Sequence, residues 1–427
     1  MKTAIRREIE MKDSGVEWIG YIPKDWKITK LGNLGKIQTG NTPDKSNSKY
    51  YSNENGVLWV KAENLGTIYP IEETSEYITE AGTGLARLFD KNTVFVCCIA
   101  SIGKCGYSNK KCSCNQQING ISFDKLFWKY GLYMTIAQEE EYLVSASGNV
   151  VKILNTNKQK MIKCPVPSLS EQQAIADYLD KTCSKIDEII AEAKASIDEY
   201  KELKQSVIFE AVTKGLDKNV EMKDSGIEWI GETPDSWNIR MLNQYVSQVK
   251  CKNSDLSETN LLSLSYGKIK RKDINSNGGL LPESFDNYNI VDENDIVLRL
   301  TDLQNDHKSL RVGLVTERGI ITSAYVTIRP KKINAAYLAL LLHAFDYKKG
   351  FYGMGAGIRQ GLTFDGVKSL KIVVPSDSEQ DDIVKYVMKM TDKCDSLITE
   401  KESLINDLEA YKKSLIYEVV TGKRRVV

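Results

Sequence analysis

Two long stretches of the chain carry apolar residues at the alternating three- and four-residue spacing of a paired helix. In the first, which we place at 170–214, steps of four and three from Ile175 reach apolar side chains at eight of eleven positions. In the second, at 378–427, the same steps from Ile383 reach nine of eleven. This pattern predicts two long helices with a common buried seam. The predicted seam comprises Ile175, Leu179, Ile186, Ile189, Leu203, Val207, Ile383, Val387, Leu397, Leu404, Leu408 and Leu415.

Both predicted helices begin with the same polar signal. Ser170 and Ser378 suit the N-cap position, and Gln173 and Asp381 follow three residues later, at the capping-box position. About 42 helical residues span roughly 63 Å, and a single helix of that length cannot bury its seam. We therefore expect the two helices to pair with each other, antiparallel, with one domain at each end of the pair.

The helices belong to a longer internal repeat. The segment MKDSGVEWIGYIPKDW at 11–26 shares eleven of sixteen residues with MKDSGIEWIGETPDSW at 222–237. VPSLSEQ begins at Val166 and VPSDSEQ at Val374, so the second repeat has an offset of 208 residues where the first has 211. The chain is therefore two tandem units. Each starts with what we call the opening segment and ends with a long helix.

The regions between opening segment and helix, 27–163 and 238–372, no longer match over long stretches. Both read as mixed α/β, with strand candidates at 57–60, 93–99, 118–123, 295–300 and 324–328. The predicted domains are 1–169, helix 170–214, a second domain 215–377 and helix 378–427. A repeated frame around diverged interiors indicates one task applied to two different targets.

Composition narrows the class of protein. Of 427 residues, 41% are hydrophobic and 27% charged, which is typical of globular proteins. No apolar run reaches the ~20 residues of a membrane span, and the charged N-terminus does not resemble a signal peptide. An odd number of cysteines, nine, favours a reducing cytoplasm over a disulfide framework. Cys112 and Cys114 lack zinc-knuckle spacing, so we expect no metal site.

The distribution of charge along the chain indicates binding to a negatively charged polymer. The net charge is +1, but 170–214 carries six lysines against ten acids and 378–425 nine basic residues against ten acids, which leaves +6 elsewhere. The stretch 101–130 holds five lysines against one acid, and 266–274 holds four basic residues against Asp273. Lysine and arginine neutralise phosphates, while Asn, Gln and Arg read base edges. These stretches taken alone also fit ordinary solvated loops.

The candidate DNA-contacting residues lie in lysine-rich, amide-rich and glycine-rich loops of both domains. The Gly-rich segment 351–366 lacks the strand–helix context of a nucleotide fold, so we interpret it as a loop that presents Arg359 and Gln360. The full candidate set is Thr39, Gly40, Asn41, Thr42, Lys104, Lys110, Lys111, Asn115, Gln116, Gln117, Lys268, Lys270, Arg271, Lys272, Arg359 and Gln360.

Enzyme motifs do not occur in the sequence. It contains no G-x-x-x-x-G-K-[ST], H-E-x-x-H or G-x-S-x-G, and no Asn-Pro-Pro-aromatic tetrapeptide. Two histidines and no acid cluster leave little for acid–base catalysis. Trp18, Trp26, Trp229 and Trp237 recur with the frame, so we expect them to pin each opening segment to its domain rather than to stack on bases.

Taken together, these features resemble the specificity subunit of type I restriction–modification systems. The resemblance covers essentially the whole chain. It rests on the two W-I-G-x-x-P-x-x-W openings, IQTGNTP at 37–43, SIGKCGYSNKKCSCNQQ at 101–117 and the two VPSxSEQ helix starts. The second domain has no clear counterpart of TGNTP and NQQ.

The resemblance implies a fold of two α/β (mixed α+β) target-recognition domains joined by two conserved antiparallel helices, a coiled coil, in a pseudo-two-fold, circular arrangement. It implies a non-catalytic subunit that reads both halves of a bipartite double-stranded DNA site. The helices would set the spacing and dock two methyltransferase subunits, and restriction/translocase subunits would join them. S-adenosylmethionine, ATP and Mg2+ would belong to those partners. Two competing interpretations are an autonomous nuclease or methyltransferase, which would need the missing motifs, and a coiled-coil adaptor without DNA contact.

Overall fold

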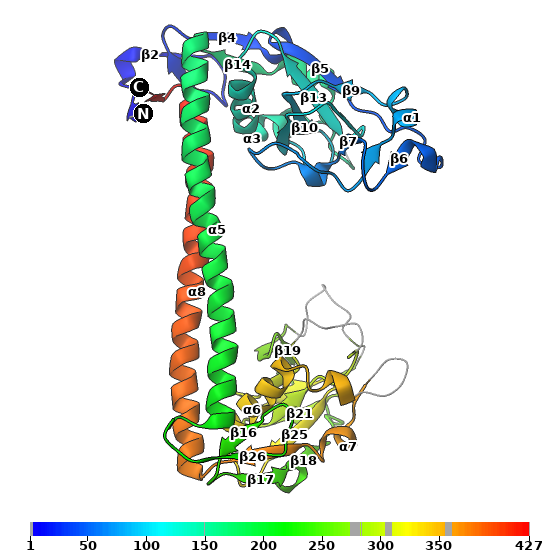
Figure 1. Cartoon of the computed structure of the whole chain (residues 1–427), viewed down its shortest axis with the longest axis vertical. Coiled ribbons are helices and arrows are strands. Elements are labelled where there is room, and N and C mark those ends of the chain that lie inside the picture. Colours follow the sequence, from blue (N-terminus) through cyan, green and yellow to red (C-terminus); the bar gives the residue numbers. More distant parts are fainter. Residues whose placement is uncertain are drawn as a thin grey trace. The chain divides into compact units, whose positions relative to one another are not determined.

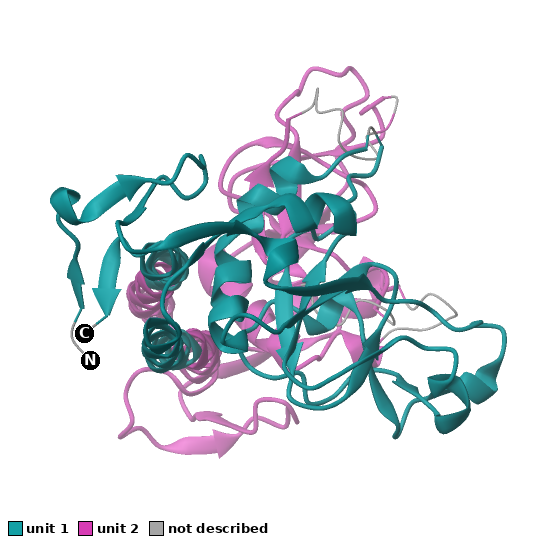
Figure 2. Cartoon of the chain, turned by 90° about the horizontal axis from the view of Figure 1, so that it is seen from above, with its two compact units in different colours: residues 1–193, 403–427 teal, residues 194–402 magenta. Residues whose placement is uncertain are grey.

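The computed structural model describes residues 3–148, 150–273, 282, 284–303, 310–354 and 361–426. It divides into two compact units, drawn in different colours in Figure 2. Unit 1 comprises Met1–Ala193 and Ser403–Val427, and unit 2 comprises Lys194–Glu402. Each unit therefore contains one end of each long helix.

Unit 1 layers one helix and two sheets. The four-stranded antiparallel sheet has the order β11-β10-β13-β5, and the five-stranded sheet β6-β8-β7-β12-β9 contains one parallel pair, β7 with β12. The strands of unit 1 as a whole are β1 (Thr3–Ile5), β2 (Met11–Asp13), β3 (Tyr21–Pro23), β4 (Lys27–Lys30), β5 (Gly35–Thr39), β6 (Tyr51–Ser52), β7 (Val57–Val60), β8 (Tyr77–Ile78), β9 (Leu88–Phe89), β10 (Thr93–Cys97), β11 (Cys105–Ser108), β12 (Cys112–Cys114), β13 (Ile118–Phe123), β14 (Lys163–Val166) and β27 (Arg424–Val426). Its short helices are α1 (Glu80–Thr83), α2 (Trp128–Ala137), α3 (Glu139–Ser145) and α4 (Thr156–Met161).

Strand alternation divides the core of unit 1 into two layers. In β10, Val94 packs with Leu132 of α2, whereas Phe95 packs with Leu58 of the other sheet. Successive side chains of a strand point to opposite faces, so one strand supplies both layers.

Unit 2 repeats this layering with fewer paired strands. Its sheet β18-β25-β22-β23 is covered by α6 on one face and by the hairpin β19–β20 and the antiparallel strand pair β21–β24 on the other. The strands are β15 (Met222–Asp224), β16 (Glu232–Pro234), β17 (Asn238–Met241), β18 (Val246–Val249), β19 (Leu262–Ser265), β20 (Lys268–Arg271), β21 (Asn289–Val291), β22 (Ile296–Leu298), β23 (Val312–Leu314), β24 (Gly319–Ile321), β25 (Val326–Pro330) and β26 (Lys371–Val374). Its short helices are α6 (Ala335–Tyr347) and α7 (Phe364–Val367). The mixed α/β prediction is confirmed, and each of the five predicted strands overlaps an observed one.

The two long helices are α5 (Leu169–Lys214) and α8 (Asp377–Val420), and they run side by side (Figure 1). Both begin earlier than predicted. The Ser168 hydroxyl accepts from the backbone N–H of Glu171, and Ser376 does the same for Glu379. The caps are therefore Ser168 and Ser376 rather than Ser170 and Ser378, because the glutamates three residues on complete the S-x-x-E signal.

The seam departs from the predicted register at alternate positions. Ile189, Leu203 and Leu404 are 45%, 44% and 39% exposed, whereas Ile190 and Ile405 are 7% and 8% exposed. In the structure the seam of α5 starts at Ala176, and its next position is three residues later. The predicted seam starts at Ile175, and its next position is four residues later. The two registers share Leu179, Ile186, Ala193, Tyr200 and Val207, and at every other position they differ by one residue. The buried or half-buried seam positions of α5 are Ala176, Leu179, Cys183, Ile186, Ile190, Ala193, Ile197, Tyr200, Lys204, Val207 and Ala211.

One lysine in each helix lies at a seam position and pairs with an aspartate of the other helix. In unit 2, Lys204 bonds the Asp395 carboxylate. In unit 1, Lys412 bonds both oxygens of Asp187 at 2.6 and 2.7 Å. These residues correspond at the repeat offset of 208, so each unit contains the same ion pair. Antiparallel pairing follows, since the late part of each helix meets the early part of the other.

Each opening segment packs where one long helix begins and the other ends. The Trp26 indole donates to Glu171 at 2.9 Å, and Gly422, just after α8, lies against Trp26 and Pro23. In unit 2 the Trp237 indole donates to Glu379 at 3.0 Å and lies against Gly215. Trp26 and Trp237 are both 1% exposed, which supports the structural role expected for them.

The ends of the chain meet in unit 1. Strand β1 pairs with β27 in antiparallel fashion, with Thr3 opposite Val426 (Figure 1). The pairing of the two chain ends agrees with the circular arrangement that the resemblance implies.

Candidate nucleic-acid interface

Two loops that the sequence singled out converge in unit 1. The Gly40 amide donates to Ile118 O at 2.9 Å, and the Asn41 amide donates to Cys114 O at 3.0 Å. The Thr42 hydroxyl donates to Gln116 Oε1. Residues 39–42 and 115–117 therefore form one surface, which we call the amide cluster.

Close packing explains the glycine in this cluster. A Cβ at Gly40 would lie 2.3 Å from Cys114 O and 2.5 Å from Cys114 Sγ, both inside van der Waals contact. Any side chain there would force the two loops apart. Gly40 thus positions its neighbours and presents no group of its own.

Two members of the amide cluster face inward and hold the loops. Thr39 donates to the buried Asn119 at 2.8 Å. The Asn41 side chain bonds backbone on both sides of Ala86, because Nδ2 donates to Leu85 O at 2.7 Å and Oδ1 accepts from the Arg87 amide at 2.5 Å. An Asn with both ends engaged by backbone is a poor base reader, so we assign Asn41 a positioning role.

The outer members keep hydrogen-bonding capacity. Gln116 and Gln117 are exposed and Asn115 is half-buried. Gln116 accepts from Thr42 through its carbonyl, and within the part of the chain that the structure describes its Nε2 group makes no hydrogen bond. An exposed primary amide with free donors suits a base edge or a phosphate.

Arg87 also belongs to this surface, although no sequence motif marks it. Its guanidinium donates to Thr39 O, and its backbone amide donates to Asn41 Oδ1. Arg87 is exposed and adds positive charge beside the glutamines. It lies in a short connection between α1 and β9 that contains no motif, so only the folded structure brings it here.

The lysines predicted for unit 1 are in different settings. Lys104 is half-buried, and its Nζ donates to Ala62 O at 3.1 Å. Lys110 and Lys111 are exposed on the turn between β11 and β12, whereas Asn115 follows the other end of β12. The pair and the amide cluster therefore lie at opposite ends of one short strand, about 10–15 Å apart at ~3.3 Å per residue.

The basic segment of unit 2 is a hairpin strand, β20. Lys268 and Lys270 alternate with Ile269, which contacts the buried core, and Lys272 follows with the same alternation. All three lysines are exposed. Lys268 also lies 3.8 Å from Asp395 of α8.

Arg271, on the other face of β20, is bound to a carboxylate. Its Nε donates to Glu317 at 2.7 and 2.9 Å. This pairing raises the pKa of Arg271 and lowers the pKa of Glu317. Arg271 is therefore less free to contact a phosphate than its lysine neighbours. Arg359 and Gln360 lie outside the described residues.

A buried arginine that the sequence did not mark holds part of unit 2 together. Arg311 is fully buried, donates to Arg299 O at 3.1 Å and to Thr301 O at 2.8 Å, and lies 4.8 Å from the Tyr352 ring centre. It therefore ties the segment after β22 to the segment after α6.

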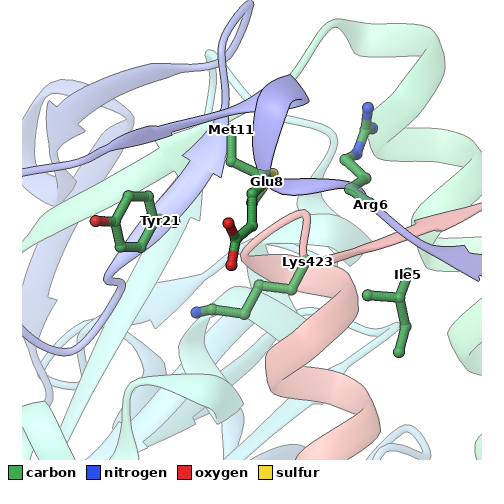
Figure 3. Close-up of a pocket in the computed structure, with 6 residues that line it drawn as sticks. All are labelled: Ile5, Arg6, Glu8, Met11, Tyr21 and Lys423. Carbon is green, nitrogen blue, oxygen red and sulfur yellow. The ribbon is translucent and has the colours of Figure 1, made fainter.

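One cavity of unit 1 lies beside the chain ends, where the opening segment meets the end of α8. Ile5, Arg6, Glu8, Met11, Tyr21 and Lys423 line a cavity of about 410 Å³ (Figure 3). Lys423 donates to Ile19 O at 2.5 Å and to the Tyr417 hydroxyl at 2.7 Å, which joins the end of α8 to the opening segment. Burial lowers the pKa of Lys423 to about 8.

Buried cysteines of unit 1 are kept in the thiol form, and the described residues contain no metal-binding cluster. Burial raises the pKa of the Cys98 thiol to about 11 and that of Cys112 to about 12, so these sulfurs stay protonated. No group of three His, Cys, Asp or Glu side chains among the described residues could hold a metal ion. In the same part of the chain, no helix is long and apolar enough to cross a membrane.

A duplicated frame that carries a different polar surface in each unit, the amide cluster in unit 1 and β20 in unit 2, defines a class of protein with two recognition surfaces. The profile of the type I restriction modification DNA specificity domain matches the chain twice, at residues 23–199 and 234–407. The chain belongs to this family.

Two known relatives match along nearly the whole length. The MjaIX specificity subunit of Methanocaldococcus jannaschii is 24% identical, over 99% of this chain and 98% of that protein. The MjaVIII specificity subunit of the same organism is 25% identical, over 95% and 94%.

Solved structures share the fold. A chain from a type I R-M system studied for complex assembly and conformational transition has a TM-score of 0.68 at 11% identity, covering 94% of this chain and 99% of that one. The HsdS subunit of Thermoanaerobacter tengcongensis has a TM-score of 0.51 at 13% identity, covering 94% and 98%.

Proposed function

We propose that this protein is the DNA-reading subunit of a type I restriction–modification complex, in which each unit reads one half of a bipartite site. The observation that carries the proposal is the combination of an internally repeated frame with diverged polar surfaces, the amide cluster in unit 1 and β20 in unit 2. The long helices connect the two units and set the spacing of the half-sites. Family membership favours this function over a protein adaptor without DNA contact.

The catalytic work belongs to partners on this proposal. Two methyltransferase subunits dock on the chain and use S-adenosylmethionine, and restriction/translocase subunits use ATP and Mg2+. The chain itself supplies no cofactor site and no reacting group, and it acts in the cytoplasm, where the DNA is. Purified alone, it is expected to lack methyltransferase, nuclease and ATPase activity. Methyl transfer to DNA by the isolated chain would overturn this part.

The test is to map methylated positions in a host that carries the complete system. A bipartite motif is expected, with a gap of fixed length between its halves. Replacing Gln116 and Gln117 by Ala should relax or abolish recognition of the half-site read by unit 1 only. Replacing Lys270 and Lys272 should weaken DNA binding and leave recognition of the half-site read by unit 1 unchanged. A continuous motif, or a change in both halves from the unit 1 variant, would contradict the proposal.

A further inference from the structure

The outer faces of the two long helices carry an identical stripe of side chains that the fold does not use. Residues three and four apart lie on one side of a helix. The stripe in α5 is Tyr178, Lys181 and Lys185, and its counterpart in α8, 208 residues later, is Tyr386, Lys389 and Lys393. All four lysines are exposed, Tyr386 is 41% exposed and Tyr178 is half-buried. We call these two sets the Tyr-Lys-Lys stripes.

The surroundings of the stripes have diverged. Asp177 corresponds to Lys385, and Asp180 corresponds to Met388, so the helix surface has changed even in the sign of its charge. Asp180 serves its own unit, because it accepts from Tyr133 at 2.6 Å and pairs with Lys129 at 2.8 Å.

Neither packing nor ion pairing accounts for the identity of the stripes. Their residues lie outside the seam, and the structure shows no ion pair for the four lysines within its described ranges. Identical exposed residues on a diverged background therefore point to something outside the chain that contacts both copies.

We propose that each Tyr-Lys-Lys stripe docks one copy of the same protein, the methyltransferase subunit, through an acidic surface on that subunit. The inference rests on the proposed function and adds the residues and the chemistry. A partner that binds twice needs the same surface twice. Tyrosine is a frequent anchor at protein interfaces, and two lysines spaced one turn apart require carboxylates opposite them.

The composition of the stripes favours a protein over DNA. Lysine also binds phosphate. However, the same side of each helix continues into an apolar residue, Ile189 or Leu397, and then into Glu192 or Glu400. Ile189 is 45% exposed and lies outside the seam, so packing between the two helices does not explain an isoleucine at this position. An apolar side chain and a carboxylate next to the lysines fit a protein surface, whereas a phosphate backbone would be repelled by the carboxylate.

The experiment counts partners. The full-length chain is mixed with the purified methyltransferase subunit of the same system, and stoichiometry is measured by analytical ultracentrifugation. The parent chain is expected to bind two copies. Lys181→Glu with Lys185→Glu should leave one copy bound, Lys389→Glu with Lys393→Glu likewise, and the four changes together should leave none. At the altered stripe, affinity should fall at least tenfold, or about 1.4 kcal/mol.

A matched control uses Lys194→Glu with Lys201→Glu. These exposed lysines of α5 correspond to Glu402 and Glu409 in α8, so their charge is not repeated. The control should bind two copies. Tyr178→Ala with Tyr386→Ala should also reduce binding while leaving the charge unchanged, and far-UV circular dichroism checks that each variant keeps its helices.

The possible failures are distinguishable. Stripe variants that bind two copies as tightly as the parent would overturn the docking assignment alone. A parent chain that binds no methyltransferase subunit would overturn the proposed function as well. Stripe variants that keep both partners but show a smaller salt dependence of DNA binding would assign the stripes to phosphate contact and refute the protein-docking proposal.

Discussion

A pair of neighbouring isoleucines in α5 tests the helix register. Ile190 is 7% exposed and occupies the observed seam, while Ile189 is 45% exposed and occupies the register predicted from apolar spacing. The two variants Ile190→Asp and Ile189→Asp place the same carboxylate one residue apart on the same helix.

The expected magnitudes differ widely. Removing a fully buried isoleucine side chain forfeits about 2–3 kcal/mol of apolar burial. Placing an unpaired carboxylate in the seam adds a desolvation cost of a few kcal/mol more. Ile190→Asp should therefore lower the free energy of unfolding by about 4–6 kcal/mol. Ile189→Asp should change it by about 0.5 kcal/mol or a little more, as a surface substitution does.

The assay is urea denaturation followed by far-UV circular dichroism, with the dependence on urea compared among variants to detect loss of cooperativity. Because the helices connect the two DNA-reading units, Ile190→Asp should also lose tight binding to the full bipartite site while half-site binding persists. Equal destabilisation by both variants, or a larger effect of Ile189→Asp, would refute the register described here.

Four further predictions address the interface, the core and the chain ends. Lys110→Ala with Lys111→Ala should lower the log–log salt slope of DNA binding by about 1.8, roughly 0.9 per phosphate contact, measured against Lys104→Ala; an unchanged slope would remove the pair from the interface. Asn41→Ala should reduce thermal stability because it frees the 85–87 loop, whereas Gln116→Ala should leave stability unchanged and weaken DNA binding by about 1–3 kcal/mol; the reverse pattern would exchange their roles. Burial lowers the pKa of His343 to about 4, below its unfolded value of about 6.5, so its stabilising contribution is present above pH 6.5 and is lost as pH falls towards 4, at most about 3 kcal/mol; the slope of unfolding free energy against pH should differ between the parent and His343→Leu in that window, and equal slopes there would contradict the assignment. A circular permutant opened at 216–219, with the old termini joined, should bind DNA like the parent in a gel-shift assay, and failure to fold would show that the 215–221 connection is needed intact.

Much of the fold could be predicted because the opening segment and the long helix each occur twice in the sequence. Duplication revealed the two units, and apolar spacing revealed both long helices. The second prediction was wrong at its end, because α8 ends at Val420 and Arg424–Val426 form β27, whereas the helix was predicted to continue to 427. The register could not be settled by counting. Steps from Ala176 and Val384 reach ten and eight apolar residues of eleven, against eight and nine for the predicted register. Small Ala176, Cys183 and charged Lys204 lie in the true seam, and only the packed structure shows that Lys204 is acceptable there because Asp395 meets it.

The candidate interface divides in the same way. Loop motifs selected 39–42 and 115–117, and backbone hydrogen bonds bring them together. The sequence alone does not show which amide side chains are already hydrogen-bonded within the protein, because Asn41 and Gln116 both carry a primary amide. Nor could it select Arg87, whose position depends on the bonds of Asn41 to the 85–87 backbone.

The repeated frame stays similar because its polar groups satisfy one another across segments. The buried hydroxyl of Tyr130 donates to Pro165 O at 2.9 Å and reaches Val420 O at 3.3 Å. Its counterpart Tyr337 donates to Val373 O at 3.0 Å and reaches Val212 O at 3.2 Å. Loss of one member of such a contact leaves a buried polar group unpaired, at about 1–3 kcal/mol. The exposed amides and lysines of the interiors have no such obligation, so they can change with the DNA sequence while the frame that carries them cannot.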